Sequence, residues 1–97
     1  MTKKLKLEEL GRIDVETFKK TEKIPVVVVL DNIRSMHNVG AAFRTADAFL
    51  VEKIILCGIT PKPPHREIHK AALGATESVD WQFYDNVKEA VIDLKTL

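Results

Sequence analysis

Two arginines, an asparagine and a glycine lie within one short polar stretch of the sequence. Asn38 precedes a helical pattern, Gly40 leaves room for another backbone or a ribose, and Arg34 and Arg44 flank the pair. A helix N-terminus offers free N–H groups and a positive dipole, which favour an anion. Helical side chains lean toward the N-terminus, which aims Arg44 back toward Arg34. These side chains could therefore converge on one phosphate or sugar; alternatively, Asn38 is only a cap and both arginines are solvated.

The flanking elements place this stretch at the end of a sheet. Val26–Leu30 is a continuous, largely β-branched run, which predicts a strand buried on both faces. A helix is predicted over 39–49 with Asn38 as its N-cap, and Ile54–Cys57 is a second buried strand. The inward positions of the helix are predicted to be Val39, Ala42, Phe43, Ala46 and Phe49.

The alternation of strand and helix continues to the end of the chain. Gly58–Arg66 holds three prolines and is predicted to be a loop, and a short helix closed by Gly74 follows. Val79–Tyr84 alternates and predicts a third, less buried strand. The last helix is capped by Asp85 or Asn86, and its predicted sheet-facing residues are Val87, Ala90, Val91 and Leu94. The predicted fold class is α/β with a parallel sheet and flanking helices, and sites in such sheets lie beyond the carboxyl ends of strands.

The first 24 residues read as a helical extension before a domain that covers 25–97. Leu5, Leu7 and Leu10 favour one short helix ended by Gly11. A second helix is predicted from an Asp14 cap through Lys20, with Val15 and Phe18 facing inward.

Composition excludes several classes of protein. The chain has 97 residues, 45% of them hydrophobic, so long disorder is not expected. One cysteine makes no internal disulfide and no thiolate zinc site. Because no apolar run is long enough to span a bilayer, we expect a reducing, cytoplasmic setting without a membrane. The net charge of +1 conceals a segment at +3, residues 34–70, and one at −3, residues 71–97, so a local surface could still meet phosphate.

Other candidate residues carry weaker signals. His65 and His69 have a helical metal spacing, but surface histidines or RNA contact are the preferred interpretations. Cys57 lies in a buried strand and is expected to be a core thiol. The aromatic residues of the third strand, Trp81, Phe83 and Tyr84, could stack on bases but are expected to pack against the core.

The stretch from Asp31 to Phe49 resembles the first conserved motif of the SpoU (TrmH) RNA methyltransferases, of the SPOUT class. The shared pattern is Asn, one residue, Gly, three residues, Arg, then Thr-Ala-x-x-Phe. The resemblance continues through Ile54–Gly58 and Lys70–Ala75 and covers roughly residues 25–97. One departure is Leu50, which stands where the family often has a glycine after the phenylalanine, and it affects a turn.

The resemblance implies transfer of a methyl group from S-adenosylmethionine to a ribose 2′-hydroxyl of tRNA or rRNA. It implies catalytic roles for Arg44, on that hydroxyl, and for the motif asparagine Asn38. Because the pKa of a guanidinium exceeds about 12, orienting the hydroxyl is a milder role for Arg44 than acting as its base. RNA-binding roles are expected for Arg34, and more weakly for Asn32 and His37.

The second and third motifs of the family are absent from the 97 residues. In the family those motifs form the trefoil knot and supply most of the cofactor pocket and much of the dimer interface, so the cofactor-binding residues are expected C-terminal to Leu97. We therefore expect the N-terminal part of a longer, homodimeric enzyme, in an α/β-knot fold without its knot. This part alone is expected neither to bind the cofactor well nor to methylate. The alternatives are a non-catalytic RNA-binding module, or an interaction module whose free sheet edge pairs with another copy.

Overall fold

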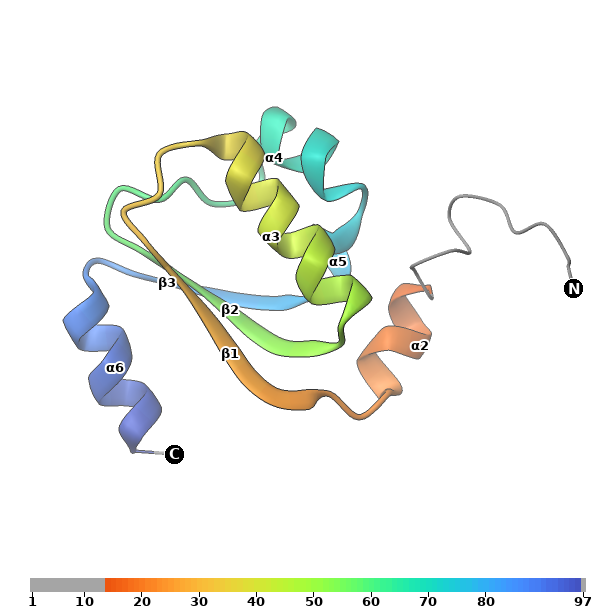
Figure 1. Ribbon diagram of the computed structural model, residues 1–97, viewed down its shortest axis with the longest axis horizontal. Helices are drawn as coiled ribbons and strands as arrows, with labels where there is room; N and C mark the ends of the chain where they lie inside the picture. The colour runs from red at the N-terminus through yellow and green to blue at the C-terminus, as the bar shows by residue number, and fades with distance from the viewer. Residues whose placement is uncertain (1–13, 97) are drawn as a thin grey trace, which may run out of the picture.

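A computed structural model describes residues 14–96 as a three-stranded parallel sheet with helices on both faces (Figure 1). The strand order is β1-β2-β3, so β2 lies between the two edges of this sheet. This arrangement confirms the predicted α/β class. In chain order the elements are α2 (Val15–Lys20), β1 (Ile24–Asp31), α3 (Met36–Ala48), β2 (Val51–Cys57), α4 (Arg66–Ala72), α5 (Ala75–Ser78), β3 (Asp80–Tyr84) and α6 (Val87–Lys95).

The main core lies between the sheet and the layer of α3, α4 and α5. Alternate residues of a strand point to opposite faces, and one set from each strand packs into this layer. The helices contribute Phe43 and Ile68, both 0% exposed, and α2 adds Phe18. The strand residues on this face are Val28, Leu30, Ile54, Leu56, Trp81 and Phe83.

The opposite face of the sheet is covered by α6 over β2 and β3. Ile55, Cys57 and Ala90 are buried there, and Tyr84 packs against them. On this helix the prediction for Val91 was wrong, because its side chain is 39% exposed.

The first strand is less buried than its sequence predicts. Val26 is 45% exposed, and residues 27–30 are only partly buried. The reason is position: β1 pairs only with β2, and α6 covers the other two strands. The prediction of burial on both faces is correct for Ile54–Cys57, where every residue is 0% exposed.

The long helix α3 begins earlier than predicted. Ser35, not Asn38, is the N-cap: its Oγ accepts the Asn38 N–H, with 3.1 Å between the oxygen and the nitrogen. Phe49 follows the helix and is 68% exposed, so its predicted inward position was wrong. Leu50 then takes φ 56, the left-handed conformation that a glycine adopts without strain, which is where the family resemblance expects a turn glycine.

Two short helices follow the proline loop, where one was predicted. The first, α4, ends at Ala72, and Leu73 takes a left-handed φ of 53. Gly74, also left-handed, precedes α5.

Of the predictions made for the two ends of the sequence, one lies within the described residues and two lie outside them. Asp14 caps α2 as predicted, and the Thr17 N–H bonded to its carboxylate lowers the pKa of Asp14. The helix predicted around Leu5–Leu10 and ended by Gly11 lies outside the described residues. Leu97, beyond which the cofactor-binding residues are expected, also lies outside them.

No helix within residues 14–96 has the length and apolar character that crossing a membrane requires.

Candidate functional site

Hydrogen bonds join the two loops at the carboxyl ends of β1 and β2. Thr60, 3% exposed, donates its hydroxyl to the Leu30 carbonyl and accepts the Ile33 N–H, with heavy-atom distances of 3.1 and 3.0 Å. The side chain of Asn32 accepts the Ile59 N–H at its Oδ1, at 3.0 Å. The two predicted loops therefore form one connected surface above the sheet.

Asn32 has a structural part in this connection. Its φ of 55 is left-handed, a conformation that asparagine tolerates better than most residues. A Cβ added at Gly58, whose φ is 66, would collide with the Asn32 Oδ1, so this glycine is needed where the loops meet. The amide oxygen of Asn32 is thus bound to backbone, while its predicted contact with RNA stays a prediction.

The other predicted residues near the start of α3 are exposed. Arg34 lies in the loop before the cap, and His37 and Asn38 lie in the first turn. Since Ser35 caps the helix, the Asn38 side chain is not used for capping, and it forms no hydrogen bond with residues 14–96. Asn38 and Arg44 are six residues apart, so their side chains leave the helix about 120° apart around its axis. Within residues 14–96 no hydrogen bond joins the side chains of Arg34, Asn38 and Arg44.

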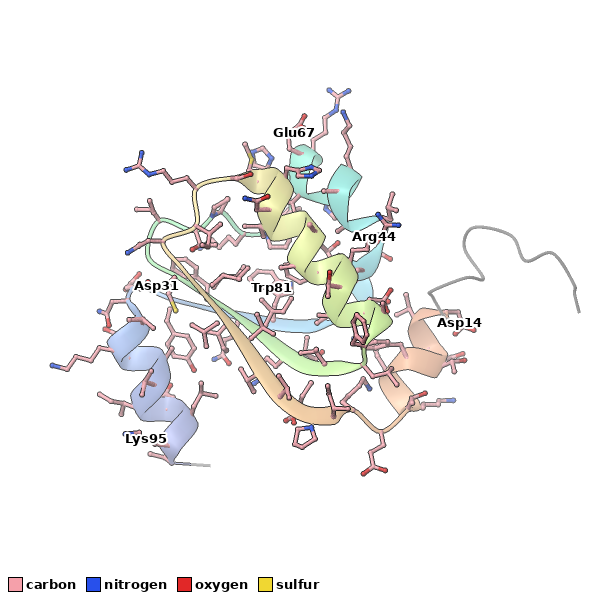
Figure 2. The ribbon with its side chains drawn as sticks, in the orientation of Figure 1. Asp14, Asp31, Arg44, Glu67, Trp81 and Lys95 are labelled. Atoms are coloured by element: carbon pink, nitrogen blue, oxygen red, sulfur yellow. The ribbon has the colours of Figure 1, made fainter. Side chains whose placement is uncertain are left out.

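Arg44 lies beside the crossing of α3 and α4. Gly40, one turn earlier, packs directly against α4: a Cβ at Gly40 would lie 2.6 Å from both the Ala71 Cβ and the Ile68 carbonyl oxygen. The space that this glycine leaves is therefore filled by another backbone, one of the two possibilities that the sequence left open. Figure 2 shows Arg44 on the same side of the sheet as Glu67 of α4, and Lys95 of α6 on the other side. Its side chain is exposed.

Titratable and aromatic groups at the strand ends serve packing. Burial, with a smaller contribution from the Asp31 carboxylate, raises the pKa of the Cys57 thiol, which keeps it protonated. Partial burial and a hydrogen bond to Asp93 raise the pKa of Tyr84. Trp81 and Phe83 pack against the main core, so core packing, not base stacking, was the correct interpretation of this strand. Cys57 is the core thiol that was predicted.

The two histidines of α4 have separate partners. The Nδ1 of His65 accepts the Glu67 N–H at 3.4 Å and caps the helix, while the Nδ1 of His69 lies 3.1 Å from the Thr76 hydroxyl. In the described part of the chain no three His, Cys, Asp or Glu side chains group as metal ligands.

Neither Gly40 nor Gly58 leaves open space beside the backbone for S-adenosylmethionine. At both glycines where the backbone leaves space, atoms of this chain fill it: those of α4 at Gly40 and those of Asn32 at Gly58. A cavity of about 250 Å³ lies elsewhere, between α6 and the sheet. It is lined by Lys53, Gln82, Tyr84, Asp93, Leu94 and Thr96. No residue of 14–96 is therefore assigned to this cofactor, and a cofactor site C-terminal to Leu97 stays a prediction.

Comparison with known families agrees with the motif and the fold. The SpoU rRNA Methylase family matches residues 25–97, which is most of the chain. The chain belongs to this family, a family of RNA methyltransferases.

Its curated relatives are considerably longer than this chain. The 23S rRNA (guanosine-2′-O-)-methyltransferase RlmB of Vibrio parahaemolyticus is 33% identical over 72 residues, 74% of this chain and 29% of the relative. The RlmB of Haemophilus influenzae is 30% identical over 92 residues, 91% of this chain and 36% of the relative. A putative TrmH family tRNA/rRNA methyltransferase of Staphylococcus haemolyticus is 30% identical over 81 residues, 84% of this chain and 32% of the relative. The chain thus spans about a third of their length.

Sequence reasoning missed the residues that hold the site together. Thr60 and Ser35 are the main examples, since each binds backbone groups that carry the candidate residues. Lys62 is another: its Nζ lies 4.0 Å from the centroid of the Phe83 ring and ties the proline loop to β3. The available signals were weak, namely a hydroxyl two residues after Gly58 and a serine three residues before the motif asparagine.

Proposed function

We propose that this chain is the N-terminal part of an S-adenosylmethionine-dependent RNA 2′-O-ribose methyltransferase. The observation that carries the proposal is the family match over residues 25–97, which includes the complete Asn-x-Gly-x-x-x-Arg motif. The relatives described as guanosine-2′-O-methyltransferases support the ribose hydroxyl as the acceptor. A homodimer is proposed for the complete enzyme on family resemblance alone.

Each candidate residue has a proposed role toward RNA. Arg44 orients the ribose 2′-hydroxyl, Asn38 has the catalytic role that the family motif implies, with an amide that capping does not use, and Arg34 binds a phosphate. His37 lies on the same face of α3 as Arg44, because seven residues are close to two helical turns, and is a further RNA contact. A guanidinium is not a proton acceptor at neutral pH, so the proposed role of Arg44 is to orient and polarise the oxygen while another group accepts the proton.

Substitution of Arg44 tests the catalytic role. In the enzyme that carries this segment, Arg44→Ala should lower kcat for methyl transfer to RNA by about 100-fold or more, because an oriented charge at the acceptor oxygen is lost. Affinity for S-adenosylmethionine should stay close to that of the parent. Arg44→Lys should recover only part of the rate, since lysine lacks the planar pair of donors. Near-normal turnover of Arg44→Ala would remove this residue from the mechanism, and Lys88→Ala on α6 is the matched surface control.

For the chain taken alone, RNA binding without methyl transfer is a second candidate function. Two observations favour it. Protein atoms fill the spaces at Gly40 and Gly58, and the basic side chains of the loops after β1 and β2 are exposed.

A further inference from the structure

The proline loop and α4 expose three basic side chains that have no role in the proposed catalytic site. We call this group the α4 basic surface; its members are Lys62, Arg66 and Lys70, and all three are exposed. Glu67 is the only acidic residue in the sequence between 58 and 74. The surface therefore carries a local excess of positive charge.

The packing of α4 directs two of these bases to solvent. Ile68 and Ala72, both 0% exposed, lie one helical turn apart on the face that packs against α3. Arg66 and Lys70 each precede one of them by two residues, so they lie on the opposite face of the helix. At a spacing of i and i+4 they are neighbours on that face.

The α4 basic surface is continuous with the candidate site. The hydrogen bond from the Ile33 N–H to the Thr60 hydroxyl joins the two loops. Arg34 follows Ile33 directly, and Lys62 comes two residues after Thr60. The bases of both loops and of α4 thus line one side of the molecule.

The other side of the molecule carries a small excess of acidic side chains. Four acids of β3, α6 and the turn between them are exposed there, namely Asp80, Asp85, Glu89 and Asp93, together with two basic residues of α6, Lys88 and Lys95. A polyanion is therefore favoured at the layer of α3 and α4, where basic side chains predominate. Figure 1 shows α4 and α6 on opposite sides of the sheet.

We infer that the α4 basic surface binds the phosphodiester backbone of RNA and extends the contact beyond the motif residues at the start of α3. The inference rests on the proposed function and adds to it the residues that hold the strand outside the reacting nucleotide. Phosphate contacts of this kind set position and affinity and carry no base specificity.

The test compares two triple variants of equal charge. Lys62→Gln/Arg66→Gln/Lys70→Gln removes the α4 basic surface, and Lys20→Gln/Lys88→Gln/Lys95→Gln removes three exposed bases elsewhere. Binding of a fluorescein-labelled RNA stem-loop is followed by anisotropy between about 50 and 200 mM salt. The α4 variant should bind about tenfold more weakly or worse, with a salt slope smaller by about 2 if each phosphate contact contributes about 0.7. The control variant should bind much as the parent does.

The possible outcomes separate this inference from the proposed function. If the parent chain does not bind RNA, the proposed RNA site falls and this inference with it. If the parent binds and the α4 variant binds equally well, or if the control loses as much affinity, only the α4 basic surface is refuted. Lys62 also contacts the Phe83 ring, so its substitution could lower stability. The double variant Arg66→Gln/Lys70→Gln leaves this contact in place, and thermal unfolding of each protein shows whether a weaker binder is still folded.

Discussion

The hydroxyl of Thr60 binds two backbone groups that belong to different segments of the candidate site. Thr60→Val keeps the shape of the side chain but leaves the Ile33 N–H without its partner. An unpaired buried donor costs about 1–3 kcal/mol, so the free energy of unfolding should fall by that amount. Urea unfolding measures the change. The exchange of the Ile33 amide proton with solvent should also become faster than that of the β2 amides.

Thr60→Ser is the matched control for this prediction. Serine retains the hydroxyl and loses one methyl group, so protection of the Ile33 amide should be kept. If Thr60→Val and Thr60→Ser show the same amide exchange, the hydroxyl does not hold the loop that carries Arg34.

The same scale shows why some residues of the site were predictable and others were not. Arg44 and Arg34 are both exposed, which agrees with one of the two alternatives that the sequence left open, because charged side chains on a helix face and a loop are rarely buried. Ser35 and Asn38 are both good N-caps, and local sequence does not decide between them. Which of the two residues caps the helix depends on where β1 ends and how the loop enters α3. Thr60 was missed because its two partners, Leu30 and Ile33, lie 30 and 27 residues away in the sequence.

At the scale of elements, the closest helix contact is the crossing of α3 over α4 at Gly40. In an open helix, replacing glycine by alanine stabilises a protein by about 1 kcal/mol. Here the new Cβ would lie 2.6 Å from the Ile68 carbonyl oxygen, which is backbone and cannot move without shifting α4. Gly40→Ala should therefore lower the free energy of unfolding, by about 1–3 kcal/mol. Denaturant unfolding monitored by circular dichroism checks the sign.

Thr45→Ala on the exposed face of α3 is the control for Gly40→Ala. It should leave stability unchanged or raise it by up to about 0.5 kcal/mol, because alanine is the better helix former. An increase in stability for Gly40→Ala would mean that α3 and α4 are not in close contact in solution.

The type and order of the elements were more predictable than their environment. Strand Ile54–Cys57 was predicted correctly because an apolar run of that kind fits a central strand. The same pattern at Val26–Leu30 gave the wrong burial, since the sequence does not say which strand lies at an edge of the described sheet. Phe49 was misplaced because a helical spacing cannot show that the helix ends one residue earlier.

At the scale of the whole chain, the net charge of +1 conceals opposite faces. Basic residues of both loops and of α4 lie on one side, and on the other side the acids of β3 and α6 are only partly offset by Lys88 and Lys95. The charge difference between the segments was visible in the sequence. Its separation in space required the sheet, because α4 and α6 lie on opposite faces of it.

At the scale of the whole chain, binding of the cofactor can be tested directly. Isothermal titration calorimetry of the 97-residue chain with S-adenosylmethionine should show no binding at micromolar concentrations. The reason is that the motifs expected to supply most of the cofactor pocket are absent from these 97 residues, and that Gly40 and Gly58 leave no open space beside the backbone. A longer family member, which continues past the position of Leu97, should release or absorb heat under the same conditions and serves as the positive control. A clear micromolar site on this chain would contradict the expectation. The cavity beneath α6 would then be tested first, with Tyr84→Phe as a probe of its lining.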